Sequence, residues 1–211
     1  MPEPTTLLLF TATALLFAAS PGPKFVFVLS RSVSHGRAEG LMSVLGIGTG
    51  ALVHTLAAVL GLSAILATSA LAFGAVKLLG AVYLVYLGVR VLLENAAELP
   101  VAQVGAGNRV AAYRHGLTTM LFNPKAAVYY LAVLPQFVDP LRGAPGGQLL
   151  VFGTIQALAA VAIYTVVAFG AAAVGRLLAR NLRARRVQKW LTGLTYLALG
   201  ASLAFGGRSS K

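Results

Sequence analysis

The sequence contains no cysteine, and only 10% of its 211 residues are charged. Without cysteine the chain has no disulfide framework, thiol nucleophile or cysteine-based metal site. A water-soluble domain carries far more charge to cover its surface, so a soluble class is disfavoured. The chain is instead 58% hydrophobic, with a mean hydropathy of +0.82. Long apolar runs recur along its whole length, which predicts an all-α integral membrane protein.

The apolar runs predict six transmembrane helices, at about residues 5–31, 41–67, 70–93, 115–138, 148–175 and 187–206. The first run is longer than a secretory leader and no Lys or Arg precedes it, so we expect it to remain as a span. Residues 94–114 are polar and contain Pro and Gly, which predicts a linker. The short loops leave no room for a second domain, so residues 1–211 are expected to form one transmembrane domain.

Basic residues are unevenly distributed between the predicted loops. The loops after the first, third and fifth spans carry Arg31, Arg37, Arg90, Arg109, Arg114, Arg176, Arg180, Arg183, Arg185, Arg186 and Lys189. The other side carries only Arg142, Arg208 and Lys211. Because cytoplasmic loops are enriched in Lys and Arg, both termini are predicted to lie outside. The net charge of +12 is then explained by cytoplasmic loops near anionic membrane lipids, without a nucleic-acid partner.

Two motifs recur along the chain. The first span contains "SPGPK" and the fourth contains "FNPK", with the two lysines 101 residues apart. The third span contains "KLLGAVYLVYLG" and the sixth contains "KWLTGLTYLALG". Residues 5–93 and 115–206 therefore resemble two copies of one three-helix unit, and because three is odd the second copy is inverted. Inverted repeats with paired broken helices are typical of secondary transporters whose site lies near the membrane midplane.

The prolines within the first and fourth spans predict broken helices that line a site, although a simple structural kink is the alternative for either one. The acidic residues Glu3, Glu39, Glu94, Glu98 and Asp139 all lie in loops or at span ends. A lysine within a span therefore lacks a carboxylate, so its ammonium group must extend to the membrane surface, bind carbonyl groups, lose its proton or meet a mobile anion. The α-carboxylate of an amino acid would be such an anion. The candidate substrate-binding residues are Pro21, Gly22, Pro23, Lys24, Asn123, Pro124, Lys125 and Tyr129.

The second span places Gly46, Gly50 and His54 four residues apart, on one helical face. The two glycines, with Gly80 of the third span, are predicted to be helix-packing positions. Whether this surface is buried within one subunit or in a homo-oligomer stays open. His54 is the candidate for carrying a coupling proton, with a neutral packing histidine as the alternative.

These stretches resemble the LysE/RhtB family of bacterial amino-acid exporters. The resemblance rests on "SPGPKFVFVLSRSVSHGRAEGL", "GIGTGALVHTLAAVLGLSAIL", "VKLLGAVYLVYLGVRVLL" and "GLTTMLFNPKAAVYYLAVLPQFV", over about two thirds of the chain and in the family's order. It implies a six-helix fold in the bacterial cytoplasmic (inner) membrane and export driven by the proton motive force. It points to the two proline motifs, to the glycines of the second span, and to Lys77 with Gly80.

One departure bears on the mechanism that the resemblance implies. Many relatives have an aspartate in the glycine-rich part of the second span, whereas here Gly50 is followed by Ala51. His54 or a lysine then remains as the nearby titratable group.

The function predicted from the sequence is proton-coupled export of an amino acid or a close derivative, without a cofactor or metal. Since no carboxylate is expected within the membrane, we predict a neutral substrate such as homoserine, threonine or leucine. A passive channel or a structural membrane protein is the alternative. An intramembrane hydrolase using Ser20 and His54 is a further one, although no carboxylate is in reach to orient such a pair.

Overall fold

The computed structural model describes residues 2–20, 22–62, 70–93, 107–171, 173 and 182–205, and every regular element among them is helical. The first half contains α1 (Pro4–Ala19), α2 (Pro23–His35), α3 (Arg37–Ala57), the π-helical turn η1 (Ala58–Leu62) and α5 (Ala70–Leu93). The second half contains α6 (Arg109–Leu121), α7 (Pro124–Val128), the π-helical turn η2 (Tyr129–Val133), the 3-10 turns η3 (Leu134–Phe137) and η4 (Pro140–Arg142), α8 (Pro145–Phe169) and α10 (Leu182–Phe205). The all-α prediction is confirmed for these residues.

Two predicted boundaries are displaced for local reasons. The α3 helix begins at Arg37 rather than near residue 41, because Gly36 has a φ of 86° and turns the chain in a single step. The α6 helix begins at Arg109 rather than at residue 115, because Asn108 caps it. The Asn108 Oδ1 atom accepts hydrogen bonds from the backbone N–H groups of Val110 at 2.8 Å and Ala111 at 3.2 Å. The predicted linker is shortened accordingly, and its residues 94–106 lie outside the described part.

The first helix break lies where the prolines predict it. The α1 helix ends at Ala19, and Ser20 leaves the helix with extended backbone (φ −67°, ψ 130°). The α2 helix begins at Pro23, which occupies a position where its missing N–H costs nothing, and the two helices are bent by 58°. Pro21 lies outside the described residues.

The second break has the same construction with a stronger cap. The α6 helix ends at Leu121, and Pro124 begins α7. Asn123 caps α7, because its Oδ1 atom accepts hydrogen bonds from the backbone N–H groups of Lys125 at 3.0 Å and Ala126 at 3.4 Å. Each break thus places a proline at the first position of a new helical segment and a lysine at the second.

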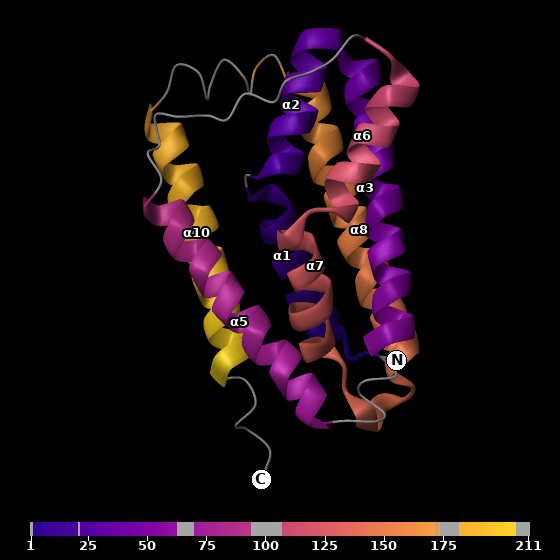
Figure 1. The fold of residues 1–211 in the computed structure, drawn as a ribbon, viewed down its shortest axis with the longest axis vertical. Helices are drawn as coiled ribbons and strands as arrows, with labels where there is room; N and C mark the ends of the chain where they lie inside the picture. Colours follow the sequence, from indigo (N-terminus) through magenta and orange to yellow (C-terminus); the bar gives the residue numbers. More distant parts are fainter. Residues whose placement is uncertain are drawn as a thin grey trace.

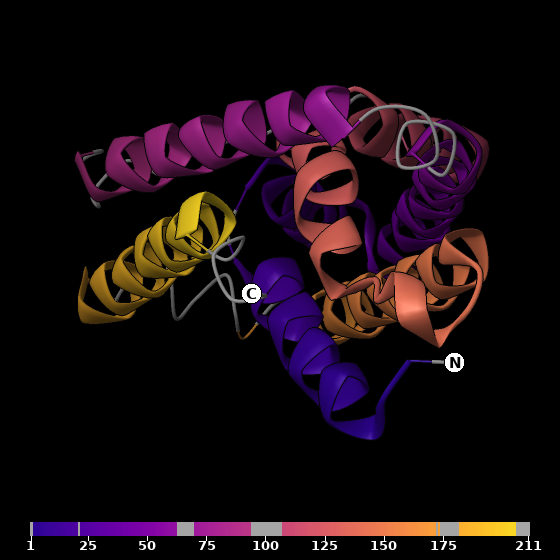
Figure 2. The ribbon, with the colours of Figure 1, turned by 90° about the horizontal axis from the view of Figure 1, so that it is seen from below.

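The helices form a bundle with an additional pair beside it (Figure 1). The α3 helix packs against α6 and α8, and α1 packs against α8. The α5 and α10 helices pack along each other, and their upper ends in Figure 1 stand apart from the other helices. The α5 helix also contacts α7 and η2, and α7 lies in the interior (Figures 1 and 2). Both helix breaks lie near mid-height in Figure 1. The chain leaves the two breaks in opposite directions, since α2 runs upward from the first and α7 runs downward from the second (Figure 1).

The outer surface of the described helices is apolar. Exposed side chains include Leu8, Leu9, Leu52, Leu56, Leu78, Leu79, Leu158, Val166 and Phe169. Three helical stretches are long and apolar enough to cross a membrane, namely Arg37–Gly61, Gly74–Leu93 and Pro145–Phe169. The bent pair of α1 and α2 is a fourth if it forms one span. The count of six spans stays a prediction, because α10 and the interrupted segment from α6 to η3 do not meet the same requirement.

Candidate functional site

The two helix breaks meet inside the protein through a serine hydroxyl. Lys125, near the start of α7, donates a hydrogen bond from Nζ to the Oγ atom of Ser20, where α1 ends, over 2.5 Å. The Ser20 hydroxyl donates to the carbonyl oxygen of Phe17 at 2.7 Å and lies 3.1 Å from the hydroxyl of Tyr196 on α10. One serine therefore links α1, α7 and α10 at the first break.

Both predicted lysines are buried, and aromatic rings surround their ammonium groups. Lys24 and Lys125 are 3% and 7% exposed. The Lys125 Nζ atom lies 4.6 Å from the ring centroid of Phe17 and 4.5 Å from that of Tyr196. The Lys24 Nζ atom lies 5.9 Å from the same Phe17 centroid and 5.8 Å from that of Tyr164. The two cations thus share the Phe17 ring, an arrangement that cation–π attraction supports.

No carboxylate of the described residues pairs with either lysine. The acidic side chains in that part of the chain are Glu3, Glu39 and Asp139, and each forms an ion pair with an arginine. Within the described part of the chain, the hydrogen-bond acceptor of Lys24 is a weak one, the Met120 sulfur at 3.4 Å. Withdrawing two ammonium groups from water without a compensating anion is costly, so this arrangement favours a ligand that carries negative charge.

Other polar groups of the site retain unused hydrogen-bonding capacity. The Asn123 Nδ2 atom and the Tyr129 hydroxyl are buried and have no hydrogen-bond partner among the described residues. The Tyr129 ring packs 4.0 Å from Phe17, measured between centroids, so it belongs to the same aromatic group. A Cβ atom added to Gly22 would lie 3.8 Å from Lys125 Nζ, which shows how closely the first break approaches the second lysine. Pro23 and Pro124 are exposed and serve to start their helices.

Comparison with known proteins identifies the family of the chain. The LysE type translocator family matches residues 15–207. The chain belongs to this family. An uncharacterised membrane protein of Vibrio cholerae is 32% identical to this chain, over 93% of this chain and 95% of its own length. A leucine efflux protein of Enterobacter sp. is 28% identical over 92% and 93%, and a threonine efflux protein of Escherichia coli is 33% identical over 63% and 68%. No solved structure matches the chain.

His54 of the translocator lies beside this site without contacting Ser20. Its Nε2 atom lies 3.2 Å from the carbonyl oxygen of Met120, and its ring stacks on Tyr130 with centroids 5.3 Å apart. Met120 therefore contacts His54 through its carbonyl group and Lys24 through its sulfur. The pair of Ser20 and His54 considered for a hydrolase does not form a hydrogen bond, because each of the two side chains has other partners.

The three predicted packing glycines lie at close helix contacts. A Cβ atom on Gly46 would overlap the carbonyl oxygen of Tyr113 on α6, and one on Gly50 would lie 2.7 Å from the Met120 Cβ atom. A Cβ atom on Gly80 would overlap the Cβ atom of Ala132 in η2. These glycines allow α3 to approach α6, and α5 to approach the segment that carries Lys125.

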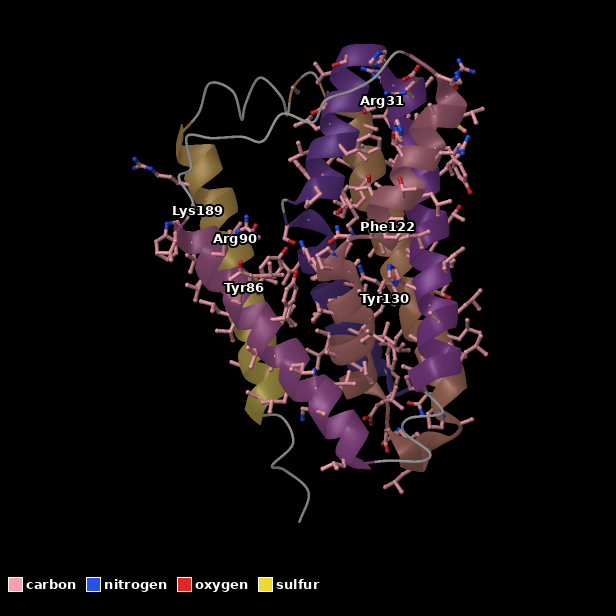
Figure 3. The ribbon with its side chains drawn as sticks, in the orientation of Figure 1. Arg31, Tyr86, Arg90, Phe122, Tyr130 and Lys189 are labelled. Atoms are coloured by element: carbon pink, nitrogen blue, oxygen red, sulfur yellow. The ribbon has the colours of Figure 1, made fainter. Side chains whose placement is uncertain are left out.

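The sequence interpretation missed several side chains that complete the site. Phe17, Tyr164 and Tyr196 provide its aromatic rings, and Met120 provides the sulfur and the carbonyl group that join Lys24 and His54. No local motif distinguishes these residues from ordinary apolar core. Ser20 directly precedes the "PGPK" motif, but the sequence interpretation considered it only as a partner of His54 in a hydrolase. Figure 3 shows Phe122 at mid-height, at the second break, and Tyr130 below it.

Proposed function

We propose that this translocator exports a neutral amino acid across the bacterial cytoplasmic membrane, and that Lys24 and Lys125 bind its α-carboxylate. The observation that carries the proposal is the pair of buried ammonium groups that share the Phe17 ring without a carboxylate among the described residues. The names of relatives support the substrate class, because leucine and threonine efflux proteins each handle a neutral amino acid by name.

The available hydrogen-bond donors fit a carboxylate. A carboxylate accepts up to four hydrogen bonds, and charge-assisted ones are the strongest. The lysines offer ammonium donors, and Asn123 Nδ2 and the Tyr129 hydroxyl have no other partner in the described part. A substrate with a cationic side chain would meet two lysines and no described carboxylate. We therefore propose a neutral side chain rather than that of lysine or arginine.

Alternating access by two inverted repeats is the proposed transport mechanism, with repeats at about 5–93 and 115–206. The contact between α5 and α10 supports this symmetry, because matched positions of the two repeats make matched contacts. A Cβ atom on Gly88 would lie 3.0 Å from the Gly193 carbonyl oxygen, and one on Gly200 would lie 3.1 Å from that of Ala81. Adding 112 to Gly88 and Ala81 gives Gly200 and Gly193, so the two contacts exchange under the repeat.

Orientation and coupling are part of the same proposal. The end of the bundle with Arg31 in Figure 3 would face the cytoplasm, and the end where α1 begins and α10 ends would face outside. His54 is the proposed carrier of the coupling proton, since it connects to Lys24 through Met120. Binding of substrate would shift the inward–outward equilibrium by its differential affinity for the two states.

A transport assay with matched analogues tests the proposal. Proteoliposomes that contain the purified protein would be loaded with radiolabelled leucine, threonine, homoserine or lysine. Efflux would be measured with and without an imposed inward proton gradient. We expect saturable, gradient-stimulated efflux of a neutral amino acid. Unlabelled leucine should compete with the transported amino acid for the site, whereas leucinamide, which lacks the carboxylate, should not. Equal competition by leucinamide would refute carboxylate binding, and flux that never saturates and ignores the gradient would favour a passive channel.

A further inference from the structure

A second polar group lies away from the lysines. It consists of Arg31, Glu39 and the backbone carbonyl group of Asn108, and we call it the Arg31 cluster. Arg31 is 0% exposed, and its Nε atom lies 2.8 Å from Oε2 of Glu39. Its guanidinium group also donates to the carbonyl oxygen of Asn108 at 3.2 Å. His35 lies 4.0 Å from the same Glu39 oxygen. Through these contacts Arg31 joins the end of α2 to the first turns of α3 and α6.

The Arg31 cluster lies directly over the lysine site along α2. Lys24, Val28 and Arg31 are spaced by four and three residues, so they share one helical face, and all three are buried. Seven residues of α-helix correspond to a rise of about 10 Å. Figure 3 shows Arg31 near the upper end of the bundle, above the helix breaks. A solute that approaches Lys24 between α2, α3 and α6 from this end must pass the Arg31 cluster.

A related cluster at the other end of the bundle is formed by Arg142, Glu3 and Asp139. The Arg142 side chain lies 3.3 Å from a carboxylate oxygen of each acidic residue. Like the Arg31 cluster, it includes the residue that precedes the first helix of a proposed repeat, since Glu3 precedes α1 as Asn108 precedes α6. All three side chains are about half exposed, at 45–48%. Exposed ion pairs contribute little to stability, whereas breaking a buried pair leaves an uncompensated charge.

We propose that the Arg31 cluster is the gate on the cytoplasmic side of the translocator and must separate before Lys24 becomes accessible from that side. Opening moves α2 away from α3 and α6 and breaks the contacts of Arg31 with Glu39 and Asn108. The exposed Arg142 cluster holds the outer end more weakly, so the structure rests closed toward the cytoplasm. The proposal depends on the proposed function only for the identity of what passes through the gate.

The test uses the absence of cysteine from the chain. Val28→Cys introduces one thiol at a 0% exposed position between Lys24 and Arg31. Its rate of reaction with a membrane-impermeant maleimide would be measured in inside-out vesicles. We expect the rate to rise about tenfold or more when Glu39→Gln is added, because the neutral amide no longer holds Arg31. The matched change Glu3→Gln, in the Arg142 cluster, should leave the rate unchanged.

A Glu39→Gln rate within about twofold of the parent, from protein that elutes as one folded species in detergent, would overturn the gate. An equal rise in the Glu3→Gln control would overturn it too. If Glu39→Gln does not fold, Arg31→Lys replaces it with the same two outcomes, since it keeps the charge but loses the guanidinium donors. Labelling needs no transport. If the labelling rate rises as expected but the protein transports no amino acid, the proposed function is refuted and the gate is not.

Discussion

Replacing Lys125 by methionine should weaken substrate binding without destabilising the folded protein. Lys125→Met keeps a long unbranched side chain and removes the ammonium group that faces Ser20, Phe17 and Tyr196. Truncating one partner of a buried charged pair typically costs about 2–5 kcal/mol of binding energy. Taking about 3 kcal/mol, and about 1.4 kcal/mol per tenfold change, the apparent substrate affinity should fall on the order of a hundredfold.

The same substitution should not destabilise the folded protein. Burying an ion costs several kcal/mol in effective desolvation. The ammonium group recovers part of this through one charged hydrogen bond of about 2 kcal/mol and cation–π contacts of about 1–2 kcal/mol. Ser20 keeps its bond to Phe17 and its contact with Tyr196 after the change. We therefore expect a stability between unchanged and about 2 kcal/mol higher.

Two assays on the same preparation check this pair of expectations. Efflux from proteoliposomes gives the apparent affinity, and thermal unfolding in detergent gives the change in stability. Lys189→Met, on the half-buried side chain near the upper end of α10 in Figure 3, is the matched control and should change neither. A Lys125→Met variant that transports like the parent would refute carboxylate binding there. One that unfolds readily would show that Lys125 is structural.

Three further predictions concern packing, capping and topology. Gly46→Ala should lower the stability by about 1–3 kcal/mol, because its Cβ atom overpacks the α3–α6 contact. Gly74→Ala should not, because a Cβ atom added there meets nothing within 4 Å. Thermal unfolding would measure both. Asn123→Ala should lose about 1 kcal/mol of capping energy. Asn123→Asp should keep the cap yet weaken substrate competition, because it supplies the lysines with a fixed carboxylate. A thiol at exposed Ser34 should react with an impermeant maleimide only in inside-out vesicles, and one at exposed Leu141 only in right-side-out vesicles; the reverse pattern would invert the topology.

The helix breaks were predictable because proline acts locally. Pro23 and Pro124 each start a helical segment in the structure, since the absence of an N–H group and the fixed φ of proline suit that position. Lysine beside each proline, in spans without acidic residues, pointed to an anion by charge balance alone. The start of α6 was missed because the capping role of Asn108 was not recognised within a polar segment.

The composition of the site was not predictable to the same degree, because it depends on contacts between distant segments. Ser20 meets Lys125 across 105 positions and Tyr196 across 176. Neither pairing leaves a local pattern, because serine and tyrosine within an apolar helix are also common packing residues. Arg31 was counted as a loop charge that sets topology, whereas the structure buries it against Glu39. One residue can serve both roles, since topology depends on charge and not on exposure.

The construction of the two breaks supports the proposal that the site binds an anion. A helix N-terminus carries a partial positive charge, and a cation placed there is unfavourable. Lys24 is nevertheless the second residue of α2, and Lys125 is the second residue after the other break. Backbone and side chains thus concentrate positive potential at mid-height, and the protein provides no described carboxylate to offset it. Aromatic faces and a serine hydroxyl hold the ammonium groups in place without neutralising them. In the proposed function a mobile anion supplies the offset, and because that anion can leave, the site would be loaded and emptied in each cycle.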